Sequence, residues 1–240
     1  MIEPIKVHRE REALKAYLGS ELGAQWQALH DRCAAIPYSL SAKARGARKL
    51  KTQALVYLAP ADPAEAARRA KVQYDAADNM TDRQGALMVL CGLDAPEREA
   101  ALADFYARFE GNLLVIDKWF SLQAGSLHPQ ALEHAKALSQ HPDFTMANPN
   151  RVRALWMALG ANPQAFHREG GEGYRLIADL ILALDPINAN TAARFVTPLG
   201  RWKKFAPDRA ALMKAELERI AACPTLSRDT REQVTRSLDG

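Results

Sequence analysis

Residues 174–184, YRLIADLILAL, decide the fold class of this 240-residue chain. Their apolar positions recur at intervals of three and four, which places them along one side of a helix: Leu176, Ile177, Leu180, Ile181 and Leu184. The same spacing runs through most of the chain, which is rich in alanine and leucine and has no convincing stretch of alternating apolar and polar residues. The sequence therefore predicts an all-α fold.

Helix start signals support this prediction. Asp62-Pro63-Ala64-Glu65 offers an N-cap, a proline at the first helical position and an acid at the third, and Thr81–Gln84 and Asp94–Glu97 have similar capping patterns. We expect helices at 8–32 (with Gly19–Gly23 as a candidate break), 42–58, 63–75, 81–91, 95–109, 112–123, 129–139, 149–159, 162–167, 174–184, 188–198, 207–221 and 227–238.

Many short helices joined by tight loops favour stacked antiparallel helix pairs over a four-helix bundle. We therefore expect an irregular α-solenoid of the HEAT or armadillo kind. Neither a linker nor a low-complexity segment interrupts the sequence, so we expect residues 1–240 to form one helical domain.

The charge balance gives little direct information about partners. Net charge is +4, from 32 Lys and Arg against 28 Asp and Glu, which is too even to indicate a nucleic-acid or membrane partner. No apolar run is long enough for a membrane span, and the first residues lack the apolar core of a signal peptide, so we expect a cytoplasmic protein. The charged first twelve residues have no organised helix start, as if the chain had been cut from a longer one.

Sequence motifs for catalysis are missing. The chain has no HExxH, P-loop, GxGxxG or GxSxG, and its three cysteines have no CxxC spacing. We therefore expect no catalytic residue and no metal site built by this chain, and three reduced, buried cysteines. The EGGEG stretch at 169–173 is expected to form a mobile turn, because its acids would repel phosphate.

Two basic stretches leave an alternative open. Lys43–Lys51 contains five cations, which we interpret as a solvated helix face with Leu50 and Leu55 on the buried side. Arg194–Arg209 mixes cations with Phe195, Trp202 and Phe205. Either stretch could serve a free-standing helical scaffold that binds protein or RNA.

The stretch FTMANPNRVR, residues 144–153, has an unusual charge arrangement. Asn148 is a natural N-cap and Pro149 a natural first helical residue. Arg151 and Arg153 then fall in the first turn, where the helix dipole disfavours positive charge. They are either solvated or placed to meet an anion, a carbonyl or a carboxylate.

Several stretches together resemble one family: DNMTD (78–82), VIDKWFSLQ (115–123), FTMANPNRVRAL (144–155), NPQAFH (162–167), GEGYRLIAD (171–179) and NTAARFVTPLGRWKKF (190–205). They are similar to the C-terminal domain of bacterial aminopeptidase N, a zinc-dependent alanyl aminopeptidase of the gluzincin class. The resemblance covers essentially the whole chain and is strongest between about 75 and 205.

The resemblance implies a non-catalytic domain that caps a catalytic domain on the same polypeptide. In the family, the zinc ligands and the other catalytic residues belong to upstream domains, and the terminal domain encloses a chamber that restricts access to small peptides. It implies that Arg153 and Arg194, with Arg151 and Asn150 of the same motif, line the chamber or its access channel and steer peptide carboxylates. The isolated chain is then expected to be an inactive part of a hydrolase, with zinc only in the parent enzyme.

Overall fold

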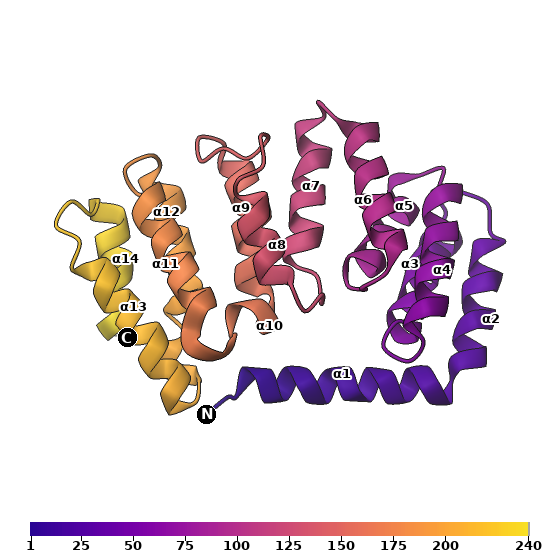
Figure 1. Cartoon of the computed structure of the whole chain (residues 1–240), viewed down its shortest axis with the longest axis horizontal. Coiled ribbons are helices and arrows are strands. Elements are labelled where there is room, and N and C mark those ends of the chain that lie inside the picture. Colours follow the sequence, from indigo (N-terminus) through magenta and orange to yellow (C-terminus); the bar gives the residue numbers. More distant parts are fainter. Residues whose placement is uncertain (240) are drawn as a thin grey trace. The chain divides into compact units, whose positions relative to one another are not determined.

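The computed structural model describes residues 1–239, which contain no β-strand (Figure 1). The α-helices are α1 (Pro4–Glu21), α2 (Gly23–Ala34), α3 (Ala42–Leu58), α4 (Pro63–Ala76), α5 (Met80–Cys91), α6 (Pro96–Phe109), α7 (Leu113–Ala124), α8 (Ala131–Leu138), α9 (Pro149–Ala161), α10 (Pro163–Phe166), α11 (Glu172–Leu184), α12 (Ala189–Leu199), α13 (Pro207–Ala221) and α14 (Arg228–Asp239). Two short 3₁₀ helices, η1 (Glu169–Gly171) and η2 (Trp202–Lys204), complete the order. The predicted all-α class is confirmed.

Helix starts follow the predicted chemistry where a capping side chain precedes a proline. Asp62 Oδ1 accepts a hydrogen bond from the Glu65 amide at 3.1 Å, and Pro63 begins α4. Asn148 Oδ1 accepts from the amides of Asn150, at 3.0 Å, and Arg151, at 3.4 Å, so the predicted cap of α9 is confirmed.

Three other predicted starts need correction. Helix α5 is capped by Asn79, whose side chain accepts from the Asp82 amide at 3.0 Å, so Thr81 lies inside the helix. Helix α6 begins after Ala95 with no side-chain cap, so Asp94 does not fill that role. Helix α1 begins at Pro4, within a segment that was expected to have no organised helix start; proline at a first helical position has no N–H group and therefore needs no capping acceptor.

The chain divides into two compact units. Unit 1 comprises Met1–His8 with the chain from Pro129 onward, and unit 2 comprises Arg9–His128. Helix α1 therefore contains residues of both units. That residues 1–240 form a single domain stays a prediction.

Each unit has its own apolar core. In unit 2, α2 packs on α3 and α4 packs on α5, and Leu55, Leu87 and Phe105 are fully buried. In unit 1, α11 packs on α12 and α12 packs on α14. The predicted stripe of α11 is buried at Ile177, Leu180, Ile181 and Leu184, while Leu176 is only half-buried.

The first residues of the chain are held inside unit 1 by backbone pairing. The Ile2 amide donates to the Lys204 carbonyl at 2.8 Å, and the Ala206 amide donates to the Ile2 carbonyl at 2.9 Å. These two bonds attach the segment before α1 to the segment between η2 and α13.

The predicted mobile turn at 169–173 forms a defined structure. Gly170 and Gly171 have φ values of 77° and 74°, a conformation that glycine adopts without steric cost. They form η1 and lead directly into α11.

No helix within residues 1–239 combines the length and apolar character that crossing a bilayer requires.

Candidate functional site

The two arginines of the FTMANPNRVR stretch differ in burial: Arg151 is buried and Arg153 is half-buried. Arg151 is only 1% exposed, and its Nη1 donates to the Asp143 carbonyl, which ties the segment before α9 to the helix. It stands four and eight residues before the buried Leu155 and Leu159, on the same side of α9. The solvated alternative is therefore wrong for Arg151.

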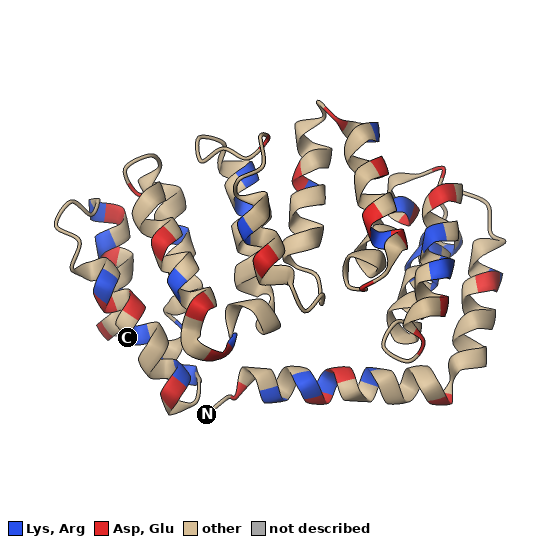
Figure 2. Ribbon diagram, in the orientation of Figure 1, with Lys and Arg blue, Asp and Glu red and all other residues tan. Residues whose placement is uncertain are grey.

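Arg153 and Asn150 remain accessible. Asn150 is exposed and Arg153 half-buried, and Arg153 Nη2 donates to Asn150 Oδ1 across the first turn of α9. This bond uses one N–H group of the guanidinium and leaves its other N–H groups available to an external acceptor. Figure 2 shows the basic residues of α9 in blue.

Arg194 lies on α12, which packs against α9 within unit 1. Its side chain is exposed and makes no hydrogen bond or ion pair with any residue in the described part of the chain. The next residue, Phe195, is buried in the core and fixes the orientation of the helix. The structure thus places Asn150, Arg153 and Arg194 on two packed helices, with Arg151 inside.

The basic stretch of α3 is only partly a solvated face. Lys43, Arg45 and Lys49 are exposed, whereas Arg48 and Lys51 are each only 9% exposed. Leu50, predicted on the buried side, is exposed. The buried side of α3 carries two cations because Arg48 and Lys51 continue the line of Ala44, Leu55 and Leu58.

The second basic stretch contains aromatic side chains that serve the core. Phe195 is buried, and Trp202 Nε1 donates to the Ser237 carbonyl at 2.9 Å. The Nζ atoms of Lys203 and Lys214 lie 5.2 and 5.7 Å from the Trp202 ring centre. These lysine stems cover the indole, as long cationic side chains often do.

The three cysteines are free, but only Cys33 and Cys91 are buried, so the prediction of burial is wrong for the half-buried Cys223.

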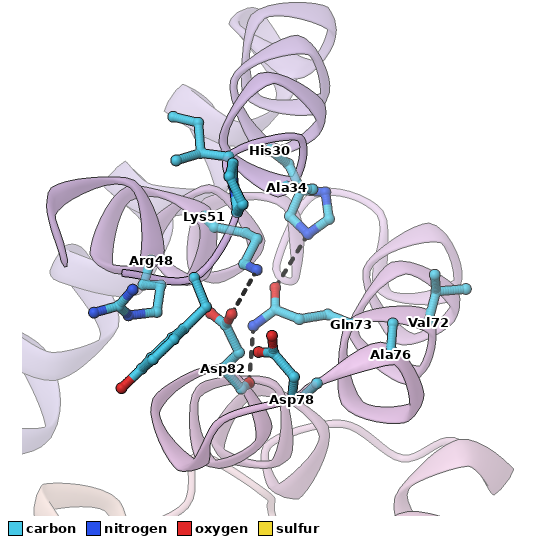
Figure 3. Close-up of a pocket in the computed structure, with 13 residues that line it drawn as sticks. His30, Ala34, Arg48, Lys51, Val72, Gln73, Ala76, Asp78 and Asp82 are labelled. Atoms are coloured by element: carbon cyan, nitrogen blue, oxygen red, sulfur yellow. Dashed lines mark hydrogen bonds and ion pairs between the residues drawn. The ribbon is translucent and has the colours of Figure 1, made fainter. Parts of the chain in front are cut away.

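Unit 2 contains a cavity of about 240 Å³ that sequence reasoning did not find (Figure 3). Its lining comes from α2, α3, α4, the start of α5 and the connections at 36–38 and 77–78: His30, Ala34, Ile36, Pro37, Tyr38, Arg48, Lys51, Val72, Gln73, Ala76, Ala77, Asp78 and Asp82. Polar and charged side chains form its floor, and several exposed apolar side chains form its rim.

A hydrogen-bonded chain crosses the floor of this cavity. Lys51 Nζ lies 2.9 Å from Asp82 Oδ2, and Gln73 Nε2 donates to the Asp82 carbonyl at 3.0 Å. Gln73 Oε1 is then the acceptor that faces His30 Nε2 at 3.2 Å. Figure 3 shows these four side chains converging from four different helices.

This chain fixes the tautomer of His30. Burial lowers the pKa of His30, so the ring is neutral at pH 7, and its proton lies on Nε2 because Gln73 presents its oxygen there. Nδ1 is then an acceptor. It lies 3.5 Å from Asp31 Oδ1 but has no proton to donate to that carboxylate.

Three lining residues each keep one buried polar atom without a hydrogen-bond partner: His30 Nδ1, Arg48 Nε and Asp82 Oδ1. Such atoms are rare in folded proteins. The sequence signal that could have indicated this polar cavity is the position of Arg48 and Lys51, which stand in line with the buried apolar residues of α3.

No group of three or more His, Cys, Asp or Glu side chains within residues 1–239 could hold a metal ion.

Comparison with known proteins relates the whole chain to one family. The model of the DUF3458_C family, described as a domain of unknown function with ARM repeats, matches residues 1–239. That description agrees with the predicted armadillo-like class.

Curated relatives give a consistent result. Aminopeptidase N of Caulobacter vibrioides is 39% identical over 238 residues, which are 98% of this chain and 28% of the relative. Aminopeptidase N of Escherichia coli K12 is 35% identical over 239 residues, 99% of this chain and 28% of the relative. This chain therefore spans little more than a quarter of the length of these relatives.

A solved structure agrees with the curated relatives. Legionella pneumophila aminopeptidase A, in complex with aspartic acid, matches with a TM-score of 0.89 and 32% identity over 98% of this chain and 28% of that chain. The resemblance to a domain of aminopeptidase N is thus confirmed. The chain belongs to the DUF3458_C family of ARM-repeat domains.

Proposed function

We propose that this chain is the non-catalytic C-terminal domain of a cytoplasmic zinc aminopeptidase that removes N-terminal residues from peptides. The observation that carries the proposal is the similarity of 98% of the chain to about a quarter of aminopeptidase N, at 39% identity. In this function the chain caps a catalytic domain on the same polypeptide, where the zinc is bound, and encloses a chamber through which peptide substrates pass.

Arg153 and Arg194 would then contact the peptide on the chamber wall. A peptide substrate ends in a carboxylate, and a guanidinium binds a carboxylate through two parallel hydrogen bonds without losing its charge. Arg194 supports this role because it is exposed and unpaired among the described residues. Asn150 orients Arg153 through their hydrogen bond, and Arg151 acts from inside by fixing the start of α9.

Docking of a catalytic domain needs exposed apolar surface. Leu113 and Leu114, at the start of α7, are 61% and 70% exposed, and such pairs on a helix terminus are suited to burial against another domain. The competing function, a scaffold that binds RNA through Lys43–Lys51, is less well supported because Arg48 and Lys51 are buried.

The test is the DNA immediately upstream of the codon for Met1. We expect an open reading frame that continues without a stop codon and encodes HExxH followed by a distant glutamate. A stop codon directly upstream, with a ribosome-binding site before Met1, would refute the proposal.

A second test uses the chain by itself. It should bind no stoichiometric zinc and hydrolyse no alanyl-p-nitroanilide, because the catalytic residues belong to another domain. Hydrolysis by the purified chain that survives further purification would contradict the non-catalytic role.

A further inference from the structure

We propose that the cavity of unit 2 binds a small zwitterion that carries one carboxylate and one ammonium group, such as a free α-amino acid with an apolar side chain. The proposal rests on the charges and open hydrogen-bonding positions of the cavity and does not depend on the function proposed above.

Arg48 supplies the position for a carboxylate. The Arg48 residue is only 9% exposed, yet among residues 1–239 its side chain pairs with no acid. Nη1 donates to the neutral carbonyl of Ser39 at 3.0 Å, the Tyr38 ring lies 4.9 Å from Cζ, and Nε has no acceptor. A buried cation without a counter-charge is unfavourable, and a bound carboxylate would supply both the charge and the missing acceptor.

Asp78 and Asp82 supply the position for an ammonium group. The Asp78 carboxylate is exposed at the cavity, and its one hydrogen bond within the described chain comes from the neutral Asn79 side chain, at 2.8 Å. Asp82 Oδ2 is taken by Lys51 and Asn79, but Oδ1 is unpartnered. In the view of Figure 3, Arg48 lies to one side of Asp82 and Asp78 to the other, which provides separate positions for the two ends of a zwitterion.

The charge balance of the cavity selects a ligand that is neutral overall. Lys51 and Asp82 neutralise each other, and the His30 ring is uncharged at pH 7, so one unpaired cation and one unpaired anion remain. A simple anion would pair with Arg48 but would be repelled by Asp78. A simple cation would pair with Asp78 but would be repelled by Arg48.

Size and rim chemistry restrict the ligand further. A volume of about 240 Å³ lies below the roughly 300–1,000 Å³ typical of sites for drug-sized ligands, which favours a single amino acid or a dipeptide. The rim contains Ile36, Pro37 and Val72, which would contact an aliphatic side chain.

The experiment measures binding of L-leucine to the full chain by isothermal titration calorimetry at pH 7. Isocaproate, which lacks the ammonium group, and isoamylamine, which lacks the carboxylate, are the matched probes. We expect each to bind at least tenfold more weakly than L-leucine. Equal binding of isocaproate, or binding of inorganic phosphate without L-leucine, would establish an anion site and overturn the proposal. If none of the probes bind, water alone satisfies the cavity, and the proposal is also wrong.

Two variants locate the ligand. Arg48→Gln and Asp78→Asn should each weaken L-leucine binding at least tenfold, and Asp78→Asn should leave the fold intact because Asp78 is exposed. Arg45→Gln and Asp94→Asn, which replace exposed residues of the same unit outside the cavity, should leave binding unchanged. Unchanged binding in Asp78→Asn would refute the site even if Arg48→Gln fails to fold.

Discussion

Arg209 Nε donates to the Glu3 carboxylate at 2.5 Å, although 206 residues separate the two in the sequence. Arg209 Nη1 also donates to the His167 carbonyl at 2.5 Å. One guanidinium therefore holds together the segment before α1, the end of α10 and the first turn of α13, all within unit 1.

The first prediction concerns this guanidinium. Arg209→Ala should lower the free energy of unfolding by about 2 kcal/mol, because it leaves both the His167 carbonyl and the Glu3 carboxylate without their donor. Glu3→Gln should cost at most about 1 kcal/mol, because Glu3 is partly exposed and the amide can still accept. Urea unfolding followed by circular dichroism measures both. Arg228→Ala, at an exposed arginine without a side-chain partner in the described chain, is the control, and an equal loss in that variant would refute the argument.

The second prediction concerns acid stability. Burial, with the nearby charge of Arg209, lowers the pKa of His167 to about 4, and its Nδ1 lies 2.7 Å from the Tyr174 hydroxyl. The folded ring thus stays neutral at a pH where the unfolded chain, with a pKa of 6.5, takes up a proton. The stability that the neutral ring contributes is complete above pH 6.5 and is lost as the pH falls towards 4.

We expect a loss of about 3 kcal/mol from this group between pH 7 and 4. His167→Asn should show a shallower decline in unfolding free energy over the same range, measured by urea unfolding at each pH. Proton NMR of the His167 ring should show no titration above pH 5.5. A midpoint near 6.5 would contradict the buried neutral state.

The third prediction uses two glycines of unit 1. A Cβ at Gly173 would lie 2.4 Å from the Phe166 carbonyl oxygen and 2.6 Å from that of Ala165, both of them backbone atoms that cannot move aside. Gly173→Ala should therefore destabilise by about 1–3 kcal/mol. At Gly160, inside α9, a Cβ would meet only the Pro198 ring at 3.8 Å, so Gly160→Ala should stabilise by about 0.5–1 kcal/mol through the helix preference of alanine.

Thermal unfolding of the two variants checks this pair of predictions. The expected result is a lower Tm for Gly173→Ala and a higher Tm for Gly160→Ala. Equal shifts in the same direction would show that backbone crowding at α11 does not set the difference.

The fourth prediction tests the proposed peptide contact in the full-length aminopeptidase. Arg153→Ala and Arg194→Ala should each raise KM for short peptides about 5- to 10-fold, or about 1 kcal/mol, with little change in kcat. In the proposed function these changes remove binding of the peptide carboxylate and leave the chemistry in the catalytic domain untouched. Arg228→Ala is the matched control. A fall in kcat alone would contradict this role.

The helices could be predicted because the apolar residues that each helix buries recur every three or four positions in the sequence. For α3, α9 and α13 the expected and observed starts coincide, since Ser41 and Asn148 cap the first two and Pro207 begins the third. Helix α1 begins at Pro4, four residues before its expected start in the charged first segment, and α6 begins at Pro96, one residue after its expected start.

The candidate site was less predictable, because charged residues are mostly exposed in folded proteins, so a basic stretch indicates a solvated face. Arg48, Lys51 and Arg151 all stand on the apolar line of their helix and are buried there. Their partners, Ser39, Asp82 and Asp143, belong to other segments, and local spacing does not specify which segments meet. The apolar periodicity of each helix marks these positions as buried, although Lys43–Lys51 was interpreted as a solvated face, and only the tertiary structure shows which groups neutralise the cations or accept hydrogen bonds from them.

The pairing of Ile2 with Lys204 and Ala206 also affects the order in which parts of the chain can fold during synthesis. A ribosome adding roughly 5–20 residues per second needs several seconds to pass from the end of unit 2 to Ala206. Unit 2 can fold its core during that interval, while Met1–His8 has left the ribosome before the residues that it pairs with, Lys204 and Ala206, have been added. Met1–His8 is therefore synthesised before unit 2 but can reach its native contacts only after unit 2 is complete, and a nascent chain stalled before Lys204 would leave this segment accessible to proteases.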